Sequence, residues 1–223
     1  MASTPWPERC CGLDGSFCAS SSDFPGIKGS AQSLAALSAL RAAARSDGFD
    51  LRACSGWRSF ERQASIVTAK LEGSRPILDA DEHPVDTRGM TLAQKLEAAL
   101  RFSALPGFSR HHFGTDYDIY AQNLIPAGGW LELTCREYDE GMYFHIFGIW
   151  LSSHLEQFGF ARPFGGRGGI SREPWHISYL SEAEQCLAAF SLERALRALD
   201  ESGLYWSKEA RAFASSRFPA LFS

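Results

Sequence analysis

The sequence has no long hydrophobic run, no excess of positive charge and no paired cysteine motif, and each absence excludes a class of protein. A membrane-spanning helix requires about 18 consecutive apolar residues, and the sequence contains no such stretch. The formal net charge of −4 argues against a nucleic-acid partner, because such partners usually meet a basic surface. The six cysteines include no C-x-x-C pair, so a structural zinc ribbon is not expected.

The first residues also lack the features of a signal peptide, which are a positively charged start and a following apolar run. Three of the cysteines, Cys10, Cys11 and Cys18, lie close to this end. We interpret them as free thiols in a reducing compartment. Without a visible leader, the sequence favours the cytoplasm, whereas a cell-wall substrate would favour the periplasm or the cell wall.

Hydrophobic periodicity predicts an α+β fold, in which helices and a few strands are segregated. Helical spacing predicts helices over residues 30–45, 59–71, 91–102, 143–158 and 181–199, and one more in the last twenty residues. Strands are expected near residues 49–57, 115–120 and 175–180.

The distribution of Pro, Gly and Ser predicts how the domain is bounded. Residues 1–30 are rich in these residues and are expected to form an irregular arm. Residues 31–200 are expected to form a single domain, with residues 201–223 as a C-terminal helical extension of it. Residues 72–90 read as a long loop, and such loops inside a compact domain are often functional. The glycine-rich residues 165–169 read as a second, flexible loop.

Two segments separated in the sequence carry groups that bind divalent metals and move protons. Residues 109–118 read Ser-Arg-His-His-Phe-Gly-Thr-Asp-Tyr-Asp, and residues 173–176 read Glu-Pro-Trp-His. Two imidazoles and one carboxylate leave the fourth position of a tetrahedral zinc ion open, as in catalytic zinc sites. Zinc lowers the pKa of water to about 7, and Glu173 is a suitable base. The pair of segments therefore predicts zinc-dependent hydrolysis.

Strand periodicity leaves the identity of the first histidine ligand open. Side chains two residues apart share a face of a strand, so His112 lies with Asp118 in an unbroken strand, whereas His111 does not. His111 joins Asp118 only if the chain bends before the strand, and Gly114 is where such a bend would fall. Asp116 shares the face of Asp118 and is either a supporting partner or a competing ligand.

These segments resemble the motifs of the zinc D-alanyl-D-alanine carboxypeptidase family, which includes VanY-like enzymes, D,D-dipeptidases and phage endopeptidases. The family pattern is S-x-H-x-x-G-x-x-x-D followed downstream by E-x-W-H. The residues in register are Ser109, His111, Gly114 and Asp118 in the first motif and Glu173, Trp175 and His176 in the second. Residues 55–60, Ser-Gly-Trp-Arg-Ser-Phe, are similar to a third family segment, which is followed by a glutamine.

The resemblance implies a role for each residue of the reaction centre. His111, Asp118 and His176 would hold one catalytic zinc ion, which settles the choice between the adjacent histidines in favour of His111. Glu173 would be the catalytic base. Arg58 would also be catalytic and would meet the substrate, because a guanidinium binds a carboxylate bidentately or stabilises a developing oxyanion.

The resemblance also implies a substrate site and shows one departure from the family. Ser109 and Trp175 would contact substrate, and Gln63 would contact substrate or support Arg58. The family usually has a small residue where this chain has Asp116. An additional carboxylate near the metal affects which substrate is accepted more than it affects the class of reaction.

The fold implied by the resemblance is that of Hedgehog and D,D-peptidases, a small antiparallel sheet flanked by helices. The implied reaction is hydrolysis of the terminal D-Ala-D-Ala bond of a peptidoglycan stem peptide or of a small D-Ala-terminated peptide. The alternatives are an L,D-carboxypeptidase, a cell-wall endopeptidase, or a zinc-retaining peptidoglycan-binding module without catalysis. Glu173 and Arg58 argue against the binding module, because binding alone needs no base. The sequence does not indicate the oligomeric state.

Overall fold

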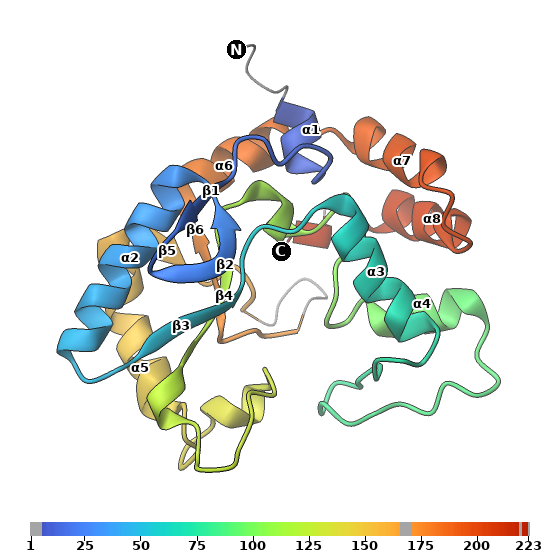
Figure 1. The fold of residues 1–223 in the computed structure, drawn as a ribbon. Coiled ribbons are helices and arrows are strands. Elements are labelled where there is room, and N and C mark those ends of the chain that lie inside the picture. The colour runs from blue at the N-terminus through green and yellow to red at the C-terminus, as the bar shows by residue number, and fades with distance from the viewer. Residues whose placement is uncertain (1–5, 166–170, 219, 223) are drawn as a thin grey trace.

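Helices surround a small antiparallel sheet in the computed structural model, which describes residues 6–165, 171–218 and 220–222 (Figure 1). Four strands form this sheet in the order β3-β4-β6-β5, and each neighbouring pair is antiparallel. Strands β1 and β2 form a separate two-stranded sheet. The arrangement confirms the α+β fold class.

The helices and strands have the following bounds. The α-helices are α1 (Trp6–Cys10), α2 (Ala31–Ser46), α3 (Phe60–Leu71), α4 (Leu92–Ala99), α5 (His145–His154), α6 (Leu180–Ala189), α7 (Leu192–Glu201) and α8 (Ser207–Arg217). The strands are β1 (Ala19–Ser21), β2 (Phe24–Gly29), β3 (Leu51–Ser55), β4 (Asp116–Ala121), β5 (Phe160–Ala161) and β6 (His176–Tyr179). The short 3₁₀ helices are η1 (Arg110–Phe113), η2 (Gln122–Leu124), η3 (Cys135–Tyr138), η4 (Leu155–Phe158) and η5 (Ala220–Phe222). Within the described ranges, no helix is both long enough and apolar enough to cross a membrane.

Side-chain caps determine where four of these helices begin. Ser30, Ser59, Thr91 and Ser191 each precede a helix, and each side chain accepts a hydrogen bond from a backbone N–H of the first turn. Such caps satisfy donors that a helix leaves unpaired at its start, and each contributes roughly 1 kcal/mol. The first three fall where the sequence predicts helix starts. The fourth divides the helix expected over residues 181–199 into α6 and α7.

Two other segments differ from the sequence expectation. Residues 6–29, within the expected irregular arm, contain α1 and the β1–β2 hairpin. The helix expected over residues 143–158 is α-helical only to His154 and continues as η4, which ends at Gly159 with a φ of 75°. The predicted glycine-rich loop lies almost entirely outside the described residues.

The two larger of the three hydrophobic cores formed by the described residues lie on either side of the molecule. In the first, Tyr117, Ile119 and Ile177 of the sheet pack with residues of α2 and α5. The second joins α3, α4, α7 and α8 around the fully buried Trp206. Figure 1 shows α2 and α5 on one side and α3, α4, α7 and α8 on the other. Because side chains alternate along a strand, the residues between those core positions on β4 and β6 face away from the first core.

Candidate metal centre and active site

The segment before β4 bends sharply, as a ligand role for His111 requires. Residues Arg110–Phe113 form the 3₁₀ helix η1, and Gly114 ends it in the left-handed region with a φ of 72°. A Cβ at Gly114 would lie 2.6 Å from the ring of Phe17, so both backbone and space favour glycine here. The bend turns the imidazole of His111 toward the side-chain face of β4 that carries Asp118.

Both ring nitrogens of His112 form hydrogen bonds with the backbone rather than with Asp118. Its Nδ1 lies 2.7 Å from the carbonyl oxygen of Arg58, and its Nε2 accepts a hydrogen bond of 3.0 Å from the backbone N–H of Gly107. The ring is completely buried, and burial lowers its pKa to about 3. A neutral ring with both nitrogens bonded has no lone pair for a metal, so His112 is a structural histidine.

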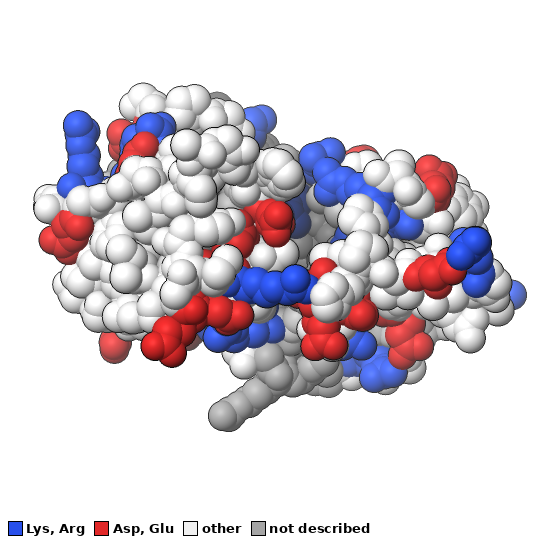
Figure 2. All heavy atoms as spheres, turned by 90° about the horizontal axis from the view of Figure 1, so that it is seen from below, with Lys and Arg blue, Asp and Glu red and all other residues white. Residues whose placement is uncertain are grey.

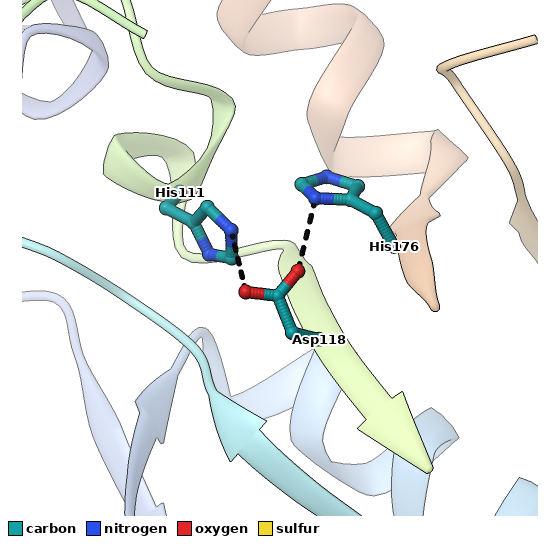
Figure 3. Close-up of side chains that lie close together, drawn as sticks. All are labelled: His111, Asp118 and His176. Carbon is teal, nitrogen blue, oxygen red and sulfur yellow. Dashed lines mark ion pairs between the residues drawn. The ribbon is translucent and has the colours of Figure 1, made fainter. Parts of the chain in front are cut away.

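The structure brings together the three residues that the resemblance assigns to the metal. His111, Asp118 and His176 are buried, and one ligand atom from each lies within 4.8 Å of the others. The carboxylate stands between the two rings (Figure 3): Nε2 of His111 lies 3.3 Å from Oδ2 of Asp118, and Nδ1 of His176 lies 3.2 Å from Oδ1. Asp118 and His176 face each other directly across the antiparallel pair β4–β6. Strand register therefore builds two of the three positions.

The free atoms of this cluster fit a zinc ion. Nδ1 of His111 lies 2.8 Å from the carbonyl oxygen of Gly56, so this nitrogen carries the proton and Nε2 is left with its lone pair. Nδ1 of His176 is buried without a hydrogen bond, although it faces the carboxylates of Asp118 and Glu173. A buried polar atom without a partner is costly unless a ligand or ion satisfies it. Two imidazoles and one carboxylate with a position left open are a catalytic zinc set.

Burial and ionic neighbours set the charge of these groups. Burial raises the pKa of Asp118, but His111 and Arg58 lower it, and it lies well below the usual value. Burial lowers the pKa of His176, but its carboxylate neighbours, first among them Asp116, raise it well above the usual value. For His111, burial and the charge of Arg58 together lower the pKa. The negative surroundings that attract a proton to His176 also attract a divalent cation, which competes with that proton.

Glu173 lies beside the cluster in a turn. The backbone N–H of His176 donates to the carbonyl of Glu173 at 3.1 Å. This turn brings the side chain of Glu173 close to the ring of His176. One carboxylate oxygen of Glu173 lies 3.4 Å from Nδ1 of His176, and 15% of the side chain is exposed. The carboxylate is thus adjacent to the ligand cluster and still accessible from the cavity described below.

Arg58 reaches the cluster from the start of α3. Its Nη2 donates to Oδ2 of Asp118 at 2.8 Å, and its Nε donates to Ser55 at 2.9 Å. Its Nη1 donates to Gln63 at 3.3 Å, and Gln63 in turn donates to the carbonyl of Ala104 at 2.8 Å. Gln63 is buried behind the guanidinium. The structure therefore places Gln63 as a support for Arg58.

A cavity of about 280 Å³ opens onto the cluster. Ser109, Trp175, Arg58 and Glu173 all line it together with the three ligand residues. In the view from below, basic and acidic side chains gather together around a hollow between two lobes (Figure 2). The cavity wall therefore offers both charge signs to a bound molecule.

Lys70 is a cavity residue that the sequence analysis did not single out. It lies on α3, its Nζ donates to the carbonyl of Phe102 at 3.3 Å, and burial lowers its pKa to about 8. Among the described residues, no carboxylate lies within ion-pair distance of its ammonium group. The available signal was helical spacing, because Lys70 follows Gln63 by two turns and residues so spaced share a helix face.

The fold and the candidate metal centre are those expected of a metallopeptidase, and the comparisons with known proteins agree. The chain matches the family VanY, D-alanyl-D-alanine carboxypeptidase, over residues 27–182. The chain therefore belongs to the VanY family, which is a family of zinc metallopeptidases, and it is an enzyme of the D-alanyl-D-alanine carboxypeptidase type.

Two curated relatives cover different shares of the chain. An uncharacterized protein of Haemophilus influenzae (strain ATCC 51907 / DSM 11121 / KW20 / Rd) is 44% identical over 88 residues, which is 38% of this chain and 67% of that protein. A D-alanyl-D-alanine carboxypeptidase of Enterococcus faecalis (strain ATCC 700802 / V583) is 28% identical over 142 residues. That match spans 62% of this chain but only 43% of the enterococcal protein.

Two solved structures share the fold. VanYB in complex with D-alanine-D-alanine has a TM-score of 0.54 and 23% identity, over 83% of this chain and 92% of that one. A mutant of the vancomycin resistance D,D-pentapeptidase VanY in complex with Zn(II) has a TM-score of 0.53 and 24% identity, over 82% and 92%. At these identities the likeness shows the fold, and it confirms the predicted small sheet flanked by helices.

Proposed function

We propose that this chain is a zinc-dependent carboxypeptidase that hydrolyses the terminal D-Ala-D-Ala bond of peptidoglycan stem peptides or related dipeptides. The observation that carries the proposal is the buried cluster of His111, Asp118 and His176, in which Nδ1 of His176 has no hydrogen bond and faces the carboxylates of Asp118 and Glu173. Family membership supports the reaction class. The named complexes of VanYB with D-alanine-D-alanine and of VanY with Zn(II) support the substrate and the metal.

The three ligand residues would hold one zinc ion, through Nε2 of His111, a carboxylate oxygen of Asp118 and Nδ1 of His176. Bound zinc supplies a Lewis acid that polarises a carbonyl group and makes water a nucleophile near neutral pH. Glu173 takes the proton from the attacking water and delivers it to the leaving amine. Proton transfer by a positioned carboxylate contributes about 10²–10⁴-fold to a rate.

Two cationic side chains orient the substrate from the α3 side of the cavity. Arg58 uses Nε, Nη1 and Nη2 for one hydrogen bond each. A guanidinium has five N–H donors, so two remain for the substrate carbonyl, where negative charge develops during the reaction. Lys70 offers an ammonium group without a carboxylate partner among the described residues, and in this proposal it binds the terminal carboxylate that a carboxypeptidase substrate must carry.

The test measures D-Ala release from a pentapeptide ending in D-Ala-D-Ala by the zinc-loaded protein. Glu173→Gln is expected to lower kcat by about 10²–10⁴-fold while zinc content stays at one ion per chain. Activity that survives both a chelator and Glu173→Gln would contradict the proposal. Release of D-Ala from a tetrapeptide but not from the pentapeptide would instead show an L,D-carboxypeptidase, and an internal cut would show an endopeptidase.

A further inference from the structure

A sealed polar cluster lies directly behind His176. Its members are Arg110, Thr115, Asp116 and Ser178, which we call the Asp116 cluster. Asp116, Thr115 and Ser178 are completely buried, and Arg110 is 5% exposed. Buried charges in proteins are normally paired or bind a metal. The partners of each charged group in the cluster therefore indicate its function.

Every group in the Asp116 cluster has a partner. Oδ1 of Asp116 accepts from Nε of Arg110 at 2.9 Å and lies 3.0 Å from Nε2 of His176. Oδ2 accepts from Thr115 at 2.6 Å and from Ser178 at 3.1 Å. Nη2 of Arg110 donates to Ser178 at 2.7 Å. The carboxylate thus has four hydrogen-bond partners, and one of them is a ligand residue of the metal cluster.

Strand register produces this arrangement. Asp116 faces Ser178 across β4–β6, two residues along from the pair formed by Asp118 and His176. Positions two apart share a face of the sheet, so the two cross-strand pairs stack side by side. The pair of Asp118 and His176 contributes two of the candidate ligands, and Asp116 of the other pair meets Nε2 of the His176 ring. Arg110 comes from η1, next to His111, and closes the cluster.

The bonds of Asp116 exclude a role as a competing ligand. Its carboxylate meets Nε2 of His176, whereas the atom facing Asp118 and Glu173 is Nδ1, on the other side of the ring. An acceptor at Nε2 keeps the proton on that nitrogen and leaves the lone pair on Nδ1. The position of Asp116 therefore supports metal binding through the ring rather than direct coordination.

We propose that Asp116 is the positioning residue of the metal centre: it fixes the ring orientation and tautomer of His176 and strengthens His176 as a zinc ligand. The proposal rests on the proposed function for the presence of zinc. Carboxylates in this position typically change metal affinity by about 10–100-fold. Arg110 balances the buried charge of Asp116.

The test compares zinc affinity with the stability of the metal-free protein in three variants. Asp116→Asn keeps an accepting oxygen for His176 but leaves the charge of Arg110 unbalanced. The double variant R110M/D116A removes both charges and also the acceptor. Thr115→Val is the matched control, because it disturbs Oδ2 of the same carboxylate and leaves the bond from Oδ1 to His176.

The two measurements are expected to rank the variants differently. Zinc affinity, measured by competition with a chelator, falls in the order wild type, Asp116→Asn, R110M/D116A, and the loss in the double variant is about 10–100-fold. Stability without metal, measured by urea denaturation, is lower for Asp116→Asn than for the double variant, because an unpaired buried charge is more destabilising than an apolar pair. Thr115→Val lowers stability and leaves zinc affinity unchanged.

Two results would overturn the proposal for Asp116. Zinc affinity that simply follows the stability of the metal-free variants would show that the cluster acts through packing alone. Wild-type zinc affinity in both Asp116→Asn and the double variant would show that His176 needs no support. A wild-type protein that binds no zinc would contradict the proposed function itself, and this outcome is distinguishable because zinc binding is measured directly.

Discussion

His111 and His176 face the same carboxylate from opposite sides, but their outer nitrogens are held by different kinds of partner. On the side of β3, Nδ1 of His111 meets the backbone carbonyl of Gly56. On the side of β6, Nε2 of His176 meets the ionised carboxylate of Asp116. A carbonyl orients a ring without adding charge, whereas a carboxylate also raises the basicity of the ligand. One side of the site therefore depends on backbone position and the other on a buried ion pair.

The largest effect is expected when either ring is removed, because in the proposed function both histidines are zinc ligands in spite of their different supports. His111→Ala and His176→Ala should each abolish retention of zinc after dialysis, and with it D-Ala release. Elemental analysis of the dialysed protein measures the loss. If one of the two variants retained a full equivalent of zinc, the histidine that it lacks would not be a zinc ligand.

A smaller effect is expected from moving the carbonyl that supports His111. A Cβ at Gly56 would lie 2.5 Å from the backbone oxygen of Lys28, so Gly56→Ala must displace the end of β3. Overpacking of this kind destabilises by about 1–3 kcal/mol. We expect stability and zinc affinity to fall together, in contrast to the different rankings expected for the Asp116 variants.

Urea denaturation and chelator competition measure these two quantities for Gly56→Ala. The matched control is Gly165→Ala, because a methyl group there meets no described atom within 4 Å. If Gly56→Ala lost stability and kept its zinc affinity, the carbonyl would not support His111, and the site would depend on the carboxylate side alone.

The smallest effect is expected at Lys70, which supports neither histidine and, in the proposed function, binds the terminal carboxylate of the substrate. Lys70→Met should raise KM for a D-Ala-terminated peptide by about tenfold or more, since a hydrogen bond to a charged group contributes about 1.5–3 kcal/mol. Burial lowers the pKa of Lys70 to about 8, and only the ammonium form attracts a carboxylate. The KM of the wild type should therefore rise as the pH passes about 8.

Steady-state kinetics between pH 6 and 9, with about the same zinc content in each sample, measure this effect. Lys70→Met should have a high KM without the rise near pH 8, whereas Lys208→Met, on the exposed surface of α8, should behave as the wild type. An unchanged KM in Lys70→Met would assign the terminal carboxylate to another group.

The sequence predicted most of the helices because their signals are local, and the family resemblance gave a candidate ligand set whose side chains the structure brings together. Caps such as Ser59 and Thr91 precede helical periodicity, and Gly114 stands where the chain must turn. The register of the motif selected His111, and the structure shows why His112 is occupied elsewhere. The helix starts and the turn at Gly114 needed only a few consecutive residues and their spacing, whereas the choice of His111 came from the family resemblance.

The remaining features depend on strand pairing and packing that local sequence patterns do not show. The contacts of Asp116 follow from the pairing of β4 with β6, which sets Ser178 opposite Asp116. Lys70 reaches the cavity because α3 packs beside the cavity. From the sequence alone, Lys70 would be read as an ordinary surface lysine. The hairpin within residues 19–29 contains Pro and Gly, and a segment of this composition is normally predicted to be a loop. Tertiary pairing, rather than local propensity, decides all three cases.

The adjacent histidine His112 has a consequence for how the enzyme acquires its metal. The backbone of Arg58 is held twice, because its N–H donates to the carbonyl of His111 and its carbonyl meets Nδ1 of His112. The segment that carries Arg58 and the segment that carries His111 and His112 are therefore joined by hydrogen bonds that involve no ion. The entropy of ordering them is lost during folding rather than during metal uptake. We expect metal loading to be a late and reversible event on a finished scaffold, so that zinc scarcity switches the enzyme off without exposing it to unfolding.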